Sequence, residues 1–100
     1  MMSMNQALLD GRRLRAAITA WGLDCAKRMR ARRIELGITQ GALAEAVGVR
    51  QSAISSFESA ITVPTDRVRV AIAVALFCEV SDIWPPIGRS EALAFTKAAA

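Results

Sequence analysis

Apolar residues recur every three or four positions along most of this chain, which is the spacing of α-helices that bury one face. Residues 5–21 show the pattern first, because Leu14, Ile18 and Trp21 fall near one side of a helix. Gly22 is placed to end this helix, since glycine readily adopts the backbone conformation that follows a last helical turn. The pattern therefore predicts a first helix over 5–21.

A second helix is predicted over residues 25–36, and Asp24 is in position to cap its amino end. Cys25 and Met29 point inward at helical spacing, while basic residues line the rest of the surface. Gly37 follows as the terminating residue. These two helices together would account for the first third of the chain.

Shorter helices follow, and local capping residues mark their ends. Thr39 is a good amino-terminal cap and Gly48 a good terminator, whereas Arg50 is a poor cap for the helix that comes after it. Pro64 and Thr65 begin a longer helix. The predicted ranges are 40–47, 51–59, 66–77 and 81–84, with 90–97 either a short terminal helix or a frayed end.

The composition fits one small all-α domain. The chain has 100 residues, of which 53% are hydrophobic, and glycines and prolines are few. Such a hydrophobic content argues against disorder, and the abundant alanine is the strongest helix former. No apolar run is long enough to span a membrane, and residues 1–10 lack the basic head and apolar middle of a signal peptide. We therefore expect a soluble, cytoplasmic protein that does not bind membranes.

Positive charge is concentrated in the first third of the chain. Residues 1–33 carry eight basic and two acidic side chains, whereas residues 34–100 carry five basic and seven acidic ones. This asymmetry indicates a polyanion contacted mainly by the amino-terminal third, with a solvated basic face as the alternative. Arg28, Arg30 and Arg32 lie on the basic side of the second helix and are candidate contacts to phosphate.

Several classes of functional site are not expected from the residues present. The chain has no histidine, and Cys25 and Cys78 alone cannot complete a zinc site. Both cysteines are expected to be buried and reduced. No serine or cysteine is paired with a base, and no glycine-rich loop is suited to holding phosphate. We therefore expect no enzyme activity, no metal and no other cofactor.

The most informative segment is 40–58, where two short helices meet across a turn. Gly48 can take the positive φ that such a turn needs, and Ala44 is small enough to let the helices approach closely. The inward-facing apolar positions are Leu43, Val47, Val49, Ile54 and Phe57. Serines leave the outer face of the later of these two helices, over 51–59, small and polar. This helix can therefore enter a DNA major groove about 12 Å wide.

With this segment the chain resembles the helix-turn-helix family of phage repressors and Cro proteins, also called the xenobiotic-response-element type. The resemblance covers residues 24–85. The strings that carry it are Arg33-Ile34-Glu35-Leu36-Gly37-Ile38-Thr39-Gln40, Leu43-Ala44, Val47-Gly48-Val49, Ile54-Ser55, Phe57-Glu58, Pro64, Ala75-Leu76 and Asp82-Ile83-Trp84-Pro85. It implies an all-α fold, which here is a compact five-helix repressor-like domain with an extra amino-terminal helix.

The resemblance also implies DNA contacts for individual residues. Gln51, Ser52, Ser55 and Ser56 match the positions that read bases. Gln51 is the strongest candidate, because its amide can pair with two atoms of an adenine. Gln40 matches a phosphate-binding position at the amino end of the first helix of the motif.

The helix over 51–59, which carries these base-reading positions, is the recognition helix, and three further positions are assigned around it. Arg33 and Glu58 match a family ion pair that joins the first helix to the recognition helix, with direct DNA contact by Arg33 as the alternative. Arg50 precedes the recognition helix and can reach a phosphate or a guanine.

The sequence departs from the family pattern at three places. The loop at 59–61 lacks the usual glycine, so its path and its phosphate contact are open. Gly41 stands where the family often has a longer polar side chain, and Arg69 stands where an apolar residue is common, which suggests the edge of the domain. The small serines of the recognition helix leave part of the specificity to DNA shape or to another segment.

Residues 1–21 precede the family module, and three interpretations remain for them. They form a dimer element whose Leu14, Ile18 and Trp21 pack across a twofold axis, a basic arm that reaches phosphate or the minor groove, or an extra helix packed on its own domain. The predicted organisation is an amino-terminal helical extension over 1–21, a DNA-binding domain over 22–86 and a carboxy-terminal tail over 87–100.

The leading hypothesis is a sequence-specific DNA-binding transcriptional regulator, a phage repressor or Cro-like protein that binds a near-palindromic operator as a homodimer. Two recognition helices about 34 Å apart would read both halves of such a site. The candidate dimer interfaces are the Leu14/Ile18/Trp21 face, the exposed part of Ala71 and Val74, and the tail over 84–95. The alternatives are a DNA-binding antitoxin whose extra helix grips a toxin, and a protein-interaction module that uses the fold without reading DNA.

Overall fold

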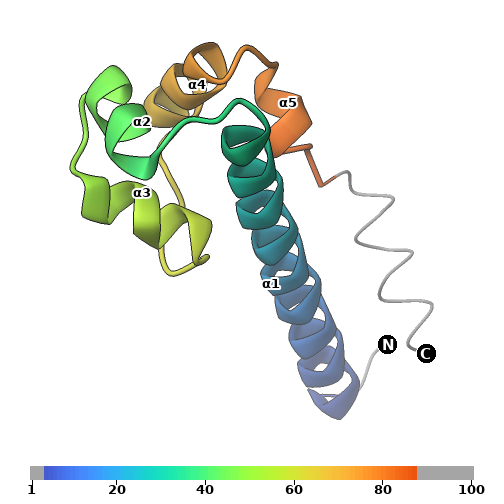
Figure 1. Cartoon of the computed structure of the whole chain (residues 1–100). Coiled ribbons are helices and arrows are strands. Elements are labelled where there is room, and N and C mark those ends of the chain that lie inside the picture. Colours follow the sequence, from blue (N-terminus) through green and yellow to red (C-terminus); the bar gives the residue numbers. More distant parts are fainter. Residues whose placement is uncertain (1–3, 88–100) are drawn as a thin grey trace. The chain divides into compact units, whose positions relative to one another are not determined.

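The structure is a computed structural model that describes residues 4–87. Within these residues it contains five helices and no strand (Figure 1). The helices are α1 (Met4–Glu35), α2 (Gln40–Val47), α3 (Gln51–Glu58), α4 (Asp66–Ala75) and α5 (Val80–Ile83). The all-α class predicted from the apolar spacing is confirmed. The helix expected over 90–97 lies outside the described residues.

The first helix, α1, is continuous where the sequence predicts two helices. Gly22 lies inside α1 and does not end it. One glycine costs a helix only about 1 kcal/mol, and the apolar positions on either side keep a spacing of three or four residues through it. Asp24, expected to be a cap, is also helical, and its Oδ2 accepts a hydrogen bond from Arg28 Nε at 2.8 Å. The expected separate amino-terminal helix is therefore the first part of α1.

The three later helices α3, α4 and α5 end one or two residues earlier than predicted, and α5 also begins one residue earlier. The third helix, α3, stops at Glu58, and the fourth, α4, stops at Ala75 although apolar residues continue beyond it. Phe77 takes a positive φ of 55°, which is incompatible with a continuing helix. The Cys78 N–H donates to Ala73 O at 3.0 Å and closes the end of α4. Apolar spacing alone does not locate such an end.

Residues Gly22–Pro85 form one compact unit, and every helix contributes to its core. The largest fully buried side chains are Met29, Leu43, Ile54, Ile72, Leu76 and Ile83. Burying each such side chain stabilises the fold by about 1.5–3 kcal/mol. Because α3 is only eight residues long, its position depends on this core.

The part of α1 that precedes Gly22 belongs to a second unit. Leu14 and Ile18 share one face of the helix there, and both are exposed. No helix of the described residues has the length and apolar character needed to cross a membrane.

Local hydrogen bonds set the ends of α2. Thr39 Oγ1 accepts from the Ala42 N–H at 3.1 Å at the amino end. Gly48 has a φ of 81° at the other end, and its N–H donates to Ala44 O at 2.9 Å. Both capping residues are the ones predicted. The left-handed conformation at Gly48 lets the chain turn sharply from α2 into α3 (Figure 1).

Candidate nucleic-acid interface

The outer face of α3 is polar and open to solvent. Gln51, Ser52 and Ser55 are exposed and Ser56 is half-buried. On the inner face Ile54 is fully buried. Within the described part of the chain, the side chains of Gln51, Ser52 and Ser55 have no hydrogen-bond partner. This face therefore has free donors and acceptors on a helix whose opposite side is fixed by packing.

The amino end of α3 adds a positive charge to this face. Arg50 is the N-cap residue, but its side chain makes no capping hydrogen bond. The side chain is exposed and has no partner among residues 4–87. The first N–H groups of a helix also lack intrahelical acceptors and carry a partial positive charge. The amino end of α3 is thus suited to contact an anion or an electronegative base edge.

An ion pair ties α3 to α1. Arg33 Nε and Nη2 donate to the two carboxylate oxygens of Glu58, at 2.7 Å and 2.9 Å. A third donor, Arg33 Nη1, reaches Ile38 O at 2.8 Å. The side chains are only 12% and 3% exposed. The structure therefore contains the ion pair expected at these positions. The Arg33 guanidinium uses three of its five N–H groups in hydrogen bonds within the protein.

The ion pair keeps Arg33 charged. Hydrogen bonding to Glu58 raises the pKa of the Arg33 guanidinium above its ordinary value, and this effect exceeds the opposing effect of burial. This stabilisation is fully present at neutral pH, which lies far below the ordinary pKa of a guanidinium. It would be lost only as the pH rises through that raised pKa, far above neutrality.

Gln40, expected at phosphate, also contacts this pair. It is the first residue of α2 and is half-buried. Its Nε2 donates to Glu58 Oε1 at 3.3 Å, a long hydrogen bond. That bond uses one of the two hydrogens on Nε2, so the other hydrogen and the backbone N–H at the start of α2 are both donors that a phosphate could use.

Arg32, another expected phosphate contact, closes the end of α4. Its Nε donates to Leu76 O at 2.9 Å and its Nη2 to Phe77 O at 3.1 Å. Leu76 is the C-cap residue of α4, where carbonyl groups lack helical partners and carry a partial negative charge. Arg32 also forms an ion pair with Glu35, in which Nη1 and Oε1 are 3.4 Å apart. Its guanidinium therefore has a structural role within the domain.

Arg28 and Arg30 differ in whether the guanidinium bonds to other residues of the domain. Arg28 forms an ion pair with Asp24, in which Nε and Oδ2 are 2.8 Å apart, and its Nη1 donates to Asp82 O at 3.3 Å. Arg30 is exposed and has no partner among the described residues. Of the three α1 arginines expected at phosphate, Arg30 is the one whose donors make no bond to the residues that the structure describes.

Arg69 explains one departure from the family pattern. Its side chain is 22% exposed, and its Nε donates to Pro64 O at 3.1 Å. The guanidinium carbon lies 5.8 Å from the centre of the Trp84 ring, within reach of a cation–π contact. The aliphatic stem and the planar head thus allow an arginine to occupy a position where an apolar residue is common.

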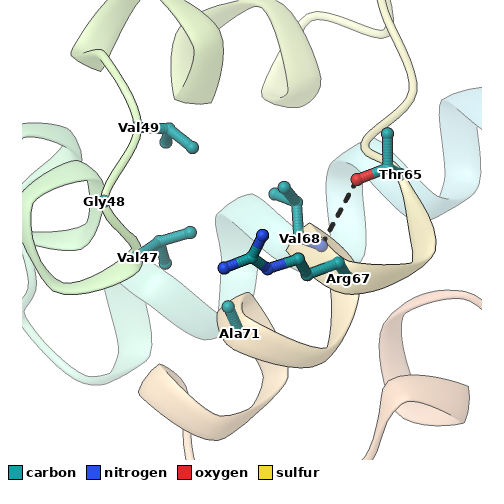
Figure 2. A pocket seen from close by; sticks show the side chains of 7 residues that line it. All are labelled: Val47, Gly48, Val49, Thr65, Arg67, Val68 and Ala71. Carbon is teal, nitrogen blue, oxygen red and sulfur yellow. Dashed lines mark hydrogen bonds between the residues drawn. The ribbon is translucent and has the colours of Figure 1, made fainter.

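Sequence reasoning did not single out Arg67, which the structure places beside the turn of the motif. A cavity of about 340 Å³ lies between that turn and the start of α4. It is lined by Val47, Gly48, Val49, Thr65, Arg67, Val68 and Ala71 (Figure 2). Figure 2 shows the Arg67 side chain extending from α4 toward the turn. Its exposed guanidinium has no partner in the part of the chain that the structure describes. No sequence pattern distinguishes Arg67 from the arginines that are paired.

The two cysteines are unpaired thiols, and the pKa of each is raised. Cys25 is buried, as expected, whereas Cys78 is only half-buried. Burial raises the pKa of both thiols, and nearby carboxylates raise it further. The reactive thiolate is therefore disfavoured at neutral pH.

Comparison with known proteins supports the motif. The family model described as helix-turn-helix matches residues 29–83. No curated protein and no solved structure shows a match. The matched segment includes α2, the turn at Gly48, α3 and both residues of the Arg33–Glu58 pair.

Proposed function

We propose that this chain, which belongs to the helix-turn-helix family of phage repressor and Cro-type DNA-binding proteins, is a sequence-specific transcriptional regulator of phage or bacterial origin. In this proposal α3 enters the major groove and places Gln51, Ser52, Ser55 and Ser56 at base edges. The observation that carries it is the outer face of α3. Its exposed polar groups have no partner within the described part of the chain, while Ile54 and the Glu58 pair hold the opposite side of the helix. Such a regulator would act in the cytoplasm, where DNA is accessible.

The partners of each arginine indicate which ones would contact phosphate. Among residues 4–87, Arg50 and Arg30 have no partner for their guanidinium groups, so we assign them the main phosphate contacts together with the amino end of α2 at Gln40. Arg28 and Arg32 would first have to give up carboxylate or carbonyl partners. Their contribution to DNA binding would therefore be smaller, and mainly through long-range attraction.

A homodimer on a near-palindromic operator completes the proposal. One recognition helix covers few base pairs, and two helices related by a twofold axis read both halves of a site about 34 Å apart. Two of the expected interfaces present exposed apolar side chains, Leu14 and Ile18 on α1 and Val74 on α4. In the tail interface expected over 84–95, Trp84 is buried and the residues from 88 onward lie outside the described part of the chain. Sedimentation on operator DNA should give two chains per duplex, and a single bound chain would contradict the dimer.

Selection from a randomised duplex pool tests the proposed function directly. The full chain should enrich one sequence with approximate twofold symmetry. It should bind that duplex roughly 10³-fold or more tightly than a scrambled duplex at physiological salt. Recovery of no shared sequence, with equal affinity for all duplexes, would reject sequence-specific regulation.

A further inference from the structure

The side chain of Gln51 lies against Gly41 across the junction of α2 and α3. A Cβ atom built at Gly41 would stand 3.5 Å from Gln51 Oε1 and 4.0 Å from its Cδ. The other atom near that position is Thr39 Oγ1, at 4.0 Å. The amide of Gln51 therefore occupies the space beside the Gly41 backbone, although it makes no hydrogen bond to the described residues.

The backbone does not require a glycine at position 41. Gly41 is the second residue of α2, and the positive-φ glycines of the described chain are Gly37 and Gly48. Apart from proline, glycine is the least favourable residue inside a helix. An alanine would fit, because its Cβ would make only ordinary van der Waals contacts. A longer side chain at position 41 would take up the space that the Gln51 amide occupies.

Gln51 is also the base-reading candidate whose position most needs to be fixed. Ser52, Ser55 and Ser56 have one rotatable bond before the hydroxyl, so the helix backbone nearly determines where each hydroxyl lies. Gln51 has three rotatable bonds, and pairing with an adenine requires both amide groups to be correctly placed. Whatever limits the rotamers of Gln51 therefore influences which base it reads.

We propose that Gly41 is a positioning residue for DNA recognition. Its missing side chain leaves the space in which the Gln51 amide lies, and this sets the base preference of α3. The inference rests on the proposed function, because it concerns how the recognition face is arranged. A residue with a γ-carbon at position 41 would occupy this space and force Gln51 into another rotamer.

The test compares Gly41→Gln with Gly41→Ala and with Ala46→Gln, which adds the same side chain at an exposed position of α2. Base preferences are measured by duplex selection and affinities by gel-shift titration. Gly41→Gln should bind the wild-type duplex about 10-fold or more weakly, and its changed preference should fall on the base pairs that Gln51→Ala also relaxes. Gly41→Ala and Ala46→Gln should keep the wild-type preference and bind within about 2-fold of wild type.

A double variant separates positioning from a general effect on α2. In a Gln51→Ala background, Gly41→Gln should cause little further loss, because the side chain that it displaces is gone. Losses that multiply in the double variant, wild-type preference in Gly41→Gln, or an equal shift in Gly41→Ala would each overturn the inference. If Gln51→Ala relaxes preference but Gly41→Gln does not, the inference alone fails. If no variant, nor the wild type, prefers any sequence, the proposed function fails.

Discussion

The arginines of α1 and the outer face of α3 contrast in how their hydrogen-bonding groups are used. Arg28, Arg32 and Arg33 donate to carboxylates and backbone carbonyls of the same domain. On α3, the exposed polar side chains that include Gln51 make no such bonds within the described residues, and neither does Arg50 before it. Three arginines of α1, the helix richest in positive charge, therefore bond within the domain, whereas the less charged α3 has its groups available for a ligand.

This contrast shows that the number of charged side chains in a segment does not indicate how many hydrogen-bond donors it can offer to a ligand. In the proposed function, the positive charge of α1 would attract a polyanion at long range whether or not each guanidinium is paired. Direct contact needs donors that are not already engaged, because breaking an internal hydrogen bond offsets the gain from a new one. The hydrogen-bond partners of an arginine therefore say more about its availability to a ligand than the number of arginines in the segment does.

The largest effect expected is the loss of one side of the Arg33–Glu58 pair. Arg33→Met would leave a carboxylate that is only 3% exposed without its main partner, which should cost about 3–5 kcal/mol of unfolding free energy. The double variant with Glu58→Leu should lose clearly less than the sum of the single losses. Urea unfolding measures all three, with the exposed Arg30→Met as the control. Strictly additive losses would mean that the pair does not couple α1 to α3.

The next effect concerns the recognition face alone. Gln51→Ala should lose roughly 1–3 kcal/mol of binding free energy on the selected duplex, because one base contact is removed. Its unfolding free energy should stay within about 0.5 kcal/mol of wild type, since the side chain is exposed. Gel-shift titration is the measurement, and Ser81→Ala on the exposed surface of α5 is the matched control. Unchanged affinity for the selected duplex would remove Gln51 from the recognition face.

A pair of α1 variants should show opposite effects. Arg32→Gln should cost about 1–2 kcal/mol of stability, because the carbonyls of Leu76 and Phe77 lose a charged donor, and should leave DNA affinity nearly unchanged. Arg30→Gln should keep its stability and weaken selected and scrambled duplexes about equally. It should also reduce the salt dependence of binding by about one unit. The reverse pattern in the two variants would invalidate the division of the α1 arginines.

The smallest effect expected changes stability and binding in opposite directions. Arg50→Ser should raise the unfolding free energy by about 0.5–1 kcal/mol, because serine caps α3 where arginine makes no capping bond. The same variant should bind DNA more weakly, with a salt dependence lower by about one unit. Thermal unfolding and titrations at several salt concentrations measure the two effects. A variant that is more stable and binds as well as wild type would show that Arg50 does not contact DNA.

Local sequence specifies those parts of the fold that depend on neighbouring residues. Thr39 and Gly48 set the ends of α2 through bonds to backbone groups at most four positions away, so the motif was readable from the chain. The Arg33–Glu58 pair spans 25 positions and was found only because the whole motif resembles a family. Gly22 was misinterpreted, since a glycine permits a helix end without enforcing one.

Which polar groups stay without partners among residues 4–87 depends on how distant segments pack. Arg32 reaches carbonyls 44 and 45 positions along the chain, and no local pattern separates it from Arg30, two residues earlier, which has no partner among the described residues. The contact of Gln51 with Gly41 likewise exists because α2 and α3 pack across the turn. Helix caps depend on bonds between neighbours along the chain, whereas the partners of a long side chain depend on which distant segments the core brings beside it.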